Sequence, residues 1–251
     1  MVQKEFKNKV SIILPNFNSS EFVLSTINSI KNQTYRNWNL IIIDDCSNKK
    51  TKKILKKFIY DKKIKILWLK KNRGAAYCRN LAIKKTKSKY LAFLDSDDIW
   101  EKNKLKVQLK YMEQNNFDFT YTYYKTFGLK SQKIKTPIKF DFDNFTKNTS
   151  IATSTMIIKR KIIQGVKFTE TAICEDYFFK CKILKKIKYA YCLKKFLTRY
   201  RIRKNSMQSN RVKNFYWIWI INYKYNKFNI LQNLRSLFFI SLNSIRKYGF
   251  K

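Results

Sequence analysis

Short apolar runs alternate with longer amphipathic stretches over the first 125 residues of the chain. The first three runs are rich in β-branched residues, and the fourth is continuously apolar, which is typical of strands buried on both faces of a sheet. The stretches between them carry apolar residues at helical spacing, as at Val23, Ile27 and Ile30, which predicts helices with one inward face. The predicted strands are residues 10–14, 40–43, 64–69, 90–94 and 119–123, and the predicted helices begin near residue 20 and span 51–60, 75–85 and 101–115.

This alternation predicts right-handed βαβ crossovers, and therefore an α/β fold with a mostly parallel, Rossmann-like sheet between helices. We expect Pro15 to end the first strand, because proline donates no hydrogen bond to a sheet. Ser19 or Ser20 can cap the helix that follows, with Glu21 in its first turn. Ligands of parallel sheets bind at the carboxyl ends of the strands, so residues there are the first candidates for a site.

The pattern loosens beyond residue 125. A strand is predicted at 151–158, a helix at 175–187, and two basic, aromatic helices after Lys213. The polar N-terminus and the absence of any long apolar stretch predict neither a signal peptide nor a transmembrane helix. We divide the chain into residues 1–125, 126–212 and 213–251.

The chain is strongly basic. Its 251 residues include 55 Lys and Arg against 16 Asp and Glu, a net charge of +39. The lysines are spread evenly among many Asn, Ile, Phe and Tyr residues, a composition that AT-rich coding drift produces. Whatever its origin, the field favours anionic lipid surfaces and diphosphates. A nucleic-acid-binding module is the alternative, but the chain shows neither an aromatic platform nor a known recognition-helix motif, so no nucleic acid is expected.

Missing residue types exclude several kinds of site. The chain has no histidine, which removes Ser–His–Asp and Cys–His catalysis and HExxH metalloprotease sites. Its four glycines form neither a GxGxxG motif nor a Walker loop. The five cysteines form no CxxC pair, which favours reduced thiols in a cytoplasmic protein. Catalysis must then use carboxylates, lysine or a metal held by oxygen.

Seven of the sixteen acidic residues gather at three places. Asp95 and Asp97 follow a predicted strand with two-residue spacing, which points both carboxylates the same way in an extended segment. Carboxylates so aligned suit Mg²⁺ or Mn²⁺, whose open positions would take a nucleotide diphosphate. The alternative is an Asp-rich turn in which Asp97 or Asp98 caps the next helix. Arg73 and Arg79 can balance diphosphate charge, although a lone arginine in so basic a chain is more often a solvated surface group.

Two further acidic pairs are candidates. Asp44 and Asp45 end a predicted strand, where they either accept hydrogen bonds from a nucleobase or ribose or form a capping turn. Glu175 and Asp176 begin a predicted helix, where the helix dipole alone favours acids. The functional alternative for this second pair is a general base that takes the proton of an acceptor hydroxyl.

Four segments, in this order, resemble the family-2 glycosyltransferases. The likeness is close over residues 10–125 and looser over residues 150–210. The first two segments are highly specific for this family, whereas the Glu–Asp pair of the third segment is weak evidence by itself. They are SIILPNFNSSEFVLSTINSIKNQTYRNWNLIIIDDCS, NRGAAYCRNLAIKKTKSKYLAFLDSDDIW, CEDYFFKCKIL and RYRIRKNSMQS.

The resemblance implies a GT-A fold and a metal-dependent, hexosyltransferase-like enzyme of bacterial cell-surface polysaccharide synthesis. Such an enzyme moves a sugar from a nucleotide-sugar, with UDP the expected nucleotide, to a hydroxyl of a glycan or lipid-linked oligosaccharide acceptor, with inversion. The QxxRW signature of processive synthases is absent, which favours single-sugar addition. The three parts of the chain then become a nucleotide-sugar-binding lobe, an acceptor-binding and catalytic-base lobe, and C-terminal amphipathic helices.

The expected location is cytoplasmic and peripheral, at the inner face of the plasma membrane. Residues 213–251 mix aromatic and basic residues as an interfacial helix does, which suits an anionic membrane surface. The alternative is a pair of helices that pack on the catalytic lobe.

The resemblance also implies roles by position. Arg203 stands where many family members carry histidine, and it can pair with phosphate but cannot ligate a metal. Cys46 stands where a glycine is usual. A non-catalytic relative that binds a partner is a further alternative, against which the intact DSDD and ED motifs argue. Pro15 and Phe17 would line the nucleobase pocket, Asp45 would contact the base with support from Asp44, Arg73 would lie near the base and diphosphate, Asp95, Asp97 and Asp98 would form the metal cluster, and Asp176 would be the general base with Glu175 beside it.

Overall fold

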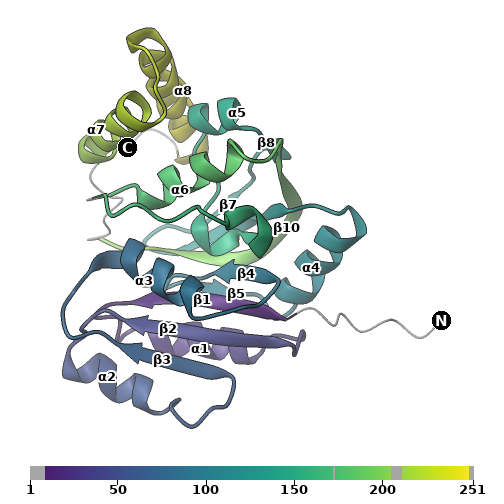
Figure 1. Ribbon diagram of the computed structural model, residues 1–251, viewed down its shortest axis with the longest axis vertical. Helices are drawn as coiled ribbons and strands as arrows, with labels where there is room; N and C mark the ends of the chain where they lie inside the picture. Colours follow the sequence, from purple (N-terminus) through teal and green to yellow (C-terminus); the bar gives the residue numbers. More distant parts are fainter. Residues whose placement is uncertain (1–8, 172, 205–210, 249–251) are drawn as a thin grey trace.

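A mixed sheet runs through the whole molecule (Figure 1). The computed structural model describes residues 9–171, 173–204 and 211–248, and within them the sheet has ten strands. Their order is β3-β2-β1-β4-β9-β6-β10-β5, with β7 paired to β6 and β8 to β10. The strands are β1 Val10–Asn16, β2 Trp38–Asp44, β3 Ile64–Trp68, β4 Tyr90–Phe93, β5 Ile99–Trp100, β6 Phe119–Gly128, β7 Gln132–Ile134, β8 Lys139–Phe140, β9 Ile157–Lys159 and β10 Ala190–Ile202.

The sheet has two halves, each built on parallel strands, and the short strands β5, β7 and β8 pair antiparallel in the second half. Strands β3, β2, β1 and β4 run parallel to one another, as do β6 and β10. The short strand β9 joins the halves by pairing antiparallel with both β4 and β6. The predicted α/β fold with a largely parallel sheet is thereby confirmed. Strands from before and after residue 125, the predicted boundary between the first two parts of the chain, belong to one continuous sheet.

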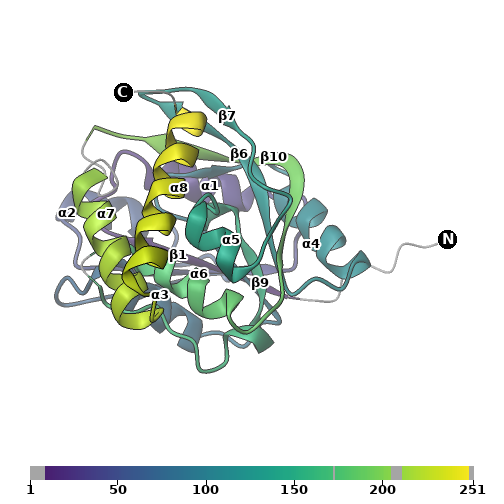
Figure 2. The same cartoon turned by 90° about the horizontal axis from the view of Figure 1, so that it is seen from above.

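Helices cover both faces of the sheet, because side chains along each strand alternate between the faces. In β1, Ile12 and Leu14 point into a core shared with α1, α2 and α4, whereas Ile13 points into the core on the α3 and α6 side. Helices α7 and α8 pack on this second side, α8 also packs on α5, and Figure 2 shows both helices in front of the sheet. The helices are α1 Val23–Lys31, α2 Lys49–Lys56, α3 Gly74–Lys84, α4 Lys104–Gln114, α5 Phe142–Lys147, α6 Glu175–Leu184, α7 Arg211–Ile220 and α8 Ile230–Tyr248.

The predicted end of the first strand is wrong, because β1 continues through Pro15 to Asn16. In a parallel strand alternate residues bond to opposite neighbours. On the side of β4, the Ile13 carbonyl accepts a hydrogen bond from the N–H of Leu94. On the side of β2, the Asn16 carbonyl accepts one from the N–H of Asp45. The missing N–H of Pro15 therefore faces the β4 side, where that strand has already ended, and no ladder bond is lost.

Other predicted boundaries also shift. Helix α1 begins at Val23, and no side chain caps its start. The backbone carbonyl of Ser19 accepts the N–H groups of Phe22 and Val23, whereas the Ser19 hydroxyl donates to Asn16 instead. The strand predicted at 151–158 shrinks to β9, and Thr153–Thr155 form a 3₁₀ turn instead. Two C-terminal helices are present, joined through a π-helical turn at Ile221–Tyr225. Among the residues that the structure describes, none of the helices is both long and apolar enough to cross a bilayer.

Candidate active site

The turn after β4 carries the first acidic cluster. Asp95 has a side chain 30% exposed, and its backbone N–H donates to the Ser154 hydroxyl at 3.1 Å. Asp97 is 15% exposed, and its Oδ2 lies 2.8 Å from Nε of Arg203 on the segment after β10. Burial and then the neighbouring Asp95 carboxylate raise the pKa of Asp97, and Arg203 acts against this rise. Both carboxylates are therefore partly exposed and paired with an arginine, and their shared metal site stays a prediction.

Asp98 has different surroundings from the other two acids of the cluster. It is almost fully buried, and its Oδ1 accepts the backbone N–H of Arg201 at 2.8 Å. Its carbonyl accepts the hydroxyl of Thr26 at 2.8 Å. Burial, followed by the carboxylates of Asp97 and Asp95, raises the pKa of Asp98 well above its usual range. Asp98 ties the turn to β10 and α1, and its role as a metal ligand stays a prediction.

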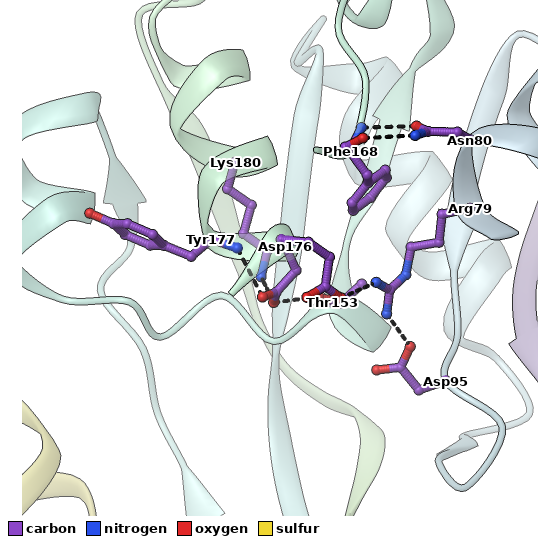
Figure 3. Close-up of polar contacts among 9 residues, drawn as sticks. Arg79, Asn80, Asp95, Thr153, Phe168, Asp176, Tyr177 and Lys180 are labelled. Atoms are coloured by element: carbon purple, nitrogen blue, oxygen red, sulfur yellow. Dashed lines mark hydrogen bonds and ion pairs between the residues drawn. The ribbon is translucent and has the colours of Figure 1, made fainter. Parts of the chain in front are cut away.

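Arg79 connects the acidic turn to the second half of the chain (Figure 3). Its guanidinium, 6% exposed, lies 2.8 Å from Asp95 Oδ1 and 2.7 Å from Glu175 Oε1. Burial would lower the pKa of Arg79, but Asp95, Glu175 and Asp176 together raise it. The surface-group alternative for Arg79 is therefore wrong, and the sequence pattern did not predict this buried bridge between two carboxylates. The available signal was the position of Arg79 three residues from both Ala76 and Ala82, which mark the buried face of α3.

Asp176 lies at the start of α6, next to Glu175. Its Oδ2 accepts from the hydroxyl of Thr153 at 2.9 Å and from Nζ of Lys180 at 2.7 Å, and its Oδ1 accepts the N–H of Tyr177 (Figure 3). Burial by itself would raise the pKa of Asp176, but the Lys180 ammonium and its hydrogen bond outweigh burial, with help from Arg79 and Thr153. The pKa is held well below its usual range, so the group is an ionised carboxylate at neutral pH.

Asp44 and Asp45 organise the loops at the end of β2. Asp44 is fully buried, and its carboxylate accepts from the Asn16 amide at 2.8 Å and from Ser47 N–H at 3.1 Å. The two oxygens of Asp45 accept the N–H groups of Arg73 and Gly74 at 2.7 and 2.8 Å. These N–H groups begin α3, where the helix dipole favours a carboxylate. Contact between Asp45 and a nucleobase stays a prediction, and it needs the lone pairs that remain on these oxygens.

The remaining predicted site residues lie at the same edge of the sheet. Pro15 is half-buried at the end of β1, and Phe17 follows with half of its surface exposed. The guanidinium of Arg73 stacks 4.2 Å from the centre of the Tyr77 ring. Cys46 has a φ of 61°, a left-handed conformation that glycine adopts without strain. This backbone requirement explains why a glycine is usual at that position.

The acidic turn offers two carboxylates, Asp95 and Asp97, to a divalent cation. No group of three or more Asp, Glu, Cys or His side chains suited to a metal is found within residues 9–171, 173–204 and 211–248. Asp95 and Asp97 each use one carboxylate oxygen in an arginine pair and remain partly exposed. Two carboxylates fit Mg²⁺ or Mn²⁺, which take few protein ligands and complete their shells with phosphate oxygens and water. The predicted closing segment reaches this turn through Arg201 and Arg203, and its residues 205–209 lie outside the described part.

The fold and the carboxylate clusters together define a GT-A glycosyltransferase. Residues 11–187 match the model of "Glycosyl transferase family 2", and the chain therefore belongs to this family. The predictions of family, fold and enzyme class are confirmed.

Relatives and solved structures agree with this assignment. The chain is 31% identical over 247 residues to TuaG of Bacillus subtilis, which is named as a teichuronic acid biosynthesis glycosyltransferase, and the match covers 96% of this chain and 98% of TuaG. It is 35% identical to WfgD of Escherichia coli, named as a UDP-Glc:alpha-D-GlcNAc-diphosphoundecaprenol beta-1,3-glucosyltransferase, with 84% and 83% covered. The structure of TarS from S. aureus with UDP-GlcNAc aligns with a TM-score of 0.75 at 20% identity, covering 97% of this chain and 73% of that one. The mannosyltransferase PcManGT of Pyrobaculum calidifontis, solved with GDP-Man and Mn²⁺, aligns with a TM-score of 0.71 at 14% identity, covering 98% and 77%.

Proposed function

We propose that this enzyme transfers a single sugar from a UDP-sugar to a hydroxyl of a lipid-linked glycan acceptor, with inversion, in cell-surface polysaccharide synthesis. The observation that carries the proposal is the Arg79 guanidinium, which binds Asp95 on one side and Glu175 on the other. It joins the carboxylates proposed for the donor to the helix proposed to carry the base. The names of TuaG and WfgD and the UDP-GlcNAc bound to TarS support the substrate class.

For the donor we propose two neighbouring subsites. Pro15, Phe17, Asp44, Asp45 and Arg73 would form the nucleobase and ribose side. Asp95 and Asp97, with Asp98 behind them, would hold Mg²⁺ or Mn²⁺ against the diphosphate. When bound, the ion would neutralise the charge that develops on the leaving diphosphate. The Mn²⁺ bound to PcManGT supports a divalent cation at such a site.

The arginines near this turn would act on the same leaving group. Arg203 is 44% exposed and paired with Asp97, so it can exchange that partner for a phosphate oxygen without desolvating a buried charge. Arg79 is held by two carboxylates and would keep Asp95 in place. The first would therefore bind the diphosphate and the second would position the turn.

For the acceptor we propose Asp176 as the general base. Asp176 is ionised at neutral pH, as a general base must be, although the Lys180 ion pair that depresses its pKa also lowers its basicity. The acceptor hydroxyl would donate to this carboxylate while its oxygen attacks the anomeric carbon opposite the diphosphate. The carbon–oxygen bond to the diphosphate breaks as the new bond forms, which inverts the anomeric centre. Thr153 and Lys180 hold the carboxylate through hydrogen bonds and would fix its orientation during attack.

We further propose that the three parts of the chain predicted from the sequence have separate functions. Residues 1–125 would bind the nucleotide-sugar, residues 126–212 would bind the acceptor and supply the base, and residues 213–251 would bring the enzyme to the membrane. The proposed location is peripheral, at the cytoplasmic face of the plasma membrane. A diphosphoundecaprenol-linked acceptor in the name of WfgD supports this location.

Calorimetric titration with UDP tests the donor site. We expect binding to the wild-type protein to require Mn²⁺ and to be lost in Asp97→Asn. Asp143→Asn is the matched control, because it removes the same charge from an exposed position on α5 and should bind UDP as the wild type does. UDP binding that is equally strong without Mn²⁺ and in Asp97→Asn would contradict the proposed donor site.

A further inference from the structure

Helix α8 exposes large apolar side chains. Leu231, Leu234 and Phe238 lie at spacings of three and four residues, on one face of the helix, and are 76%, 52% and 60% exposed. Ile230 at the helix start is 61% exposed. Within residues 230–247 of this helix, two of the three buried residues are instead polar, Asn233 and Ser236. A helix in water normally has the opposite distribution.

Hydrogen bonds fix this orientation of α8. The hydroxyl of Tyr177 on α6 donates to Asn222 Oδ1 at 2.7 Å, and Asn222 Nδ2 donates to Ser236 Oγ at 3.0 Å. Ser236 in turn donates to the carbonyl of Thr146 at 2.6 Å, and Asn233 donates to a carbonyl on α7 at 3.1 Å. Rotating α8 to bury Leu231 and Leu234 would break these buried hydrogen bonds, each of which is costly to lose. The exposed apolar face is therefore part of the fold.

The segment that carries this face is uniformly basic, although the neighbouring helix α5 carries Asp143. Residues 211–248 contain no Asp or Glu and seven Lys or Arg. Lys224 and Lys227 line a hollow of about 460 Å³ next to the first turn of α8, together with Tyr223, Phe228 and Asn229. Arg235 is exposed between Leu234 and Phe238 along the helix. Figure 1 shows α7 and α8 at the end of the molecule remote from β2 and β3.

We propose that the outer face of α8 docks on the surface of an anionic lipid bilayer. Ile230, Leu231, Leu234 and Phe238 would enter the boundary between headgroups and acyl chains, and Lys224, Lys227 and Arg235 would lie against lipid phosphates. Charge complementarity selects this occupant, since a second copy of the same basic face would repel the first. The inference rests on the peripheral location proposed above, and it names the surface responsible.

Flotation with lipid vesicles tests the docking surface. The probes are vesicles of phosphatidylglycerol mixed with phosphatidylcholine, and vesicles of phosphatidylcholine alone. The face variant carries Leu231→Gln, Leu234→Gln and Phe238→Gln, which keep good helix formers at exposed positions. The control carries Leu24→Gln, Ile59→Gln and Ile138→Gln, which remove as many exposed apolar side chains from other surfaces.

We expect the wild type and the control to bind mixed vesicles and the face variant to lose at least tenfold in partitioning. A second variant, Lys224→Gln with Lys227→Gln and Arg235→Gln, should lose roughly fivefold for each charge, and only on mixed vesicles. Equal partitioning of face variant and wild type would overturn the proposal. A wild type that sediments as a dimer, with a monomeric face variant and no vesicle binding, would assign the face to a second copy instead. UDP titration of the same proteins without lipid separates these outcomes from a failure of the donor site.

Discussion

Replacing Arg79 with methionine removes the guanidinium that joins Asp95 to Glu175 and keeps a side chain of similar length. The variant leaves two carboxylates, 30% and 14% exposed, without their shared counter-charge. Removing one partner of a buried ion pair costs about 3–5 kcal/mol, because the remaining charge is left uncompensated. Water reaches Asp95 and screens part of that loss, so we expect the free energy of unfolding to fall by about 3 kcal/mol.

Two companion variants isolate the cause. Arg79→Lys keeps the charge, but one ammonium group does not span two carboxylates as a guanidinium does, so we expect a loss of about 1–2 kcal/mol. Arg73→Met is the matched control. Arg73 is 38% exposed and lies 3.9 Å from Oε2 of Glu170, which is itself exposed, and such pairs contribute about 0–1 kcal/mol.

Urea unfolding followed by tryptophan fluorescence measures these differences. The slope of the free energy with urea concentration should be the same for all variants, so that the midpoint reports stability alone. We expect the midpoints to fall in the order wild type, Arg73→Met, Arg79→Lys and Arg79→Met. If Arg79→Met unfolded at the same urea concentration as Arg73→Met, the bridge would not stabilise the site and the reasoning would be refuted.

Two further predictions concern other charged groups. Asp176→Asn should lose roughly 10²–10⁴-fold in turnover because it removes the proposed base, while UDP affinity in the presence of Mn²⁺ stays unchanged; a variant that kept most of its turnover would exclude this role. Lys104 is fully buried, and burial lowers its pKa to about 7, so only the unfolded state holds its proton between about pH 7 and pH 10. The contribution of Lys104 to the free energy of unfolding therefore rises with pH across that window and is constant below it. In urea unfolding, Lys104→Met should reduce this rise by up to about 1.4 kcal/mol per pH unit. An unchanged dependence of stability on pH in the variant would contradict the argument from burial.

Local patterns in the sequence predicted most of the framework. The apolar runs became β1 to β4 and the start of β6, because each run is long enough to form one buried strand and its neighbours have helical periodicity. The prediction failed at 151–158, where Ala152–Thr155 turn back on themselves and only Ile157–Lys159 pair with other strands. β-Branched composition favours a strand, but it does not reveal whether a partner strand is available.

Some residues of the proposed site could be predicted from the sequence. The spacing of Asp95 and Asp97 and the position of Asp44 and Asp45 after apolar runs placed acidic residues at strand ends, because a period-two pattern and a strand terminus are local properties. The sequence did not predict which of these acidic side chains are partly exposed. The Asp98 carboxylate accepts the backbone N–H of Arg201 on β10, a strand that begins more than ninety residues later, and the Asp98 carbonyl accepts the hydroxyl of Thr26 on α1.

The sequence by itself determined the alternation of strands and helices, the family, and the residue types available for chemistry. Only the tertiary structure decided that Arg79 lies between Asp95 and Glu175, that Thr153 reaches Asp176, and that α8 turns Leu231 and Leu234 outward. These contacts join residues that are distant along the chain, and they depend on how crossovers, strand register and helix rotation combine. A periodic pattern specifies which face of one element is apolar, whereas the partner of a buried polar group is specified only when the whole chain has packed.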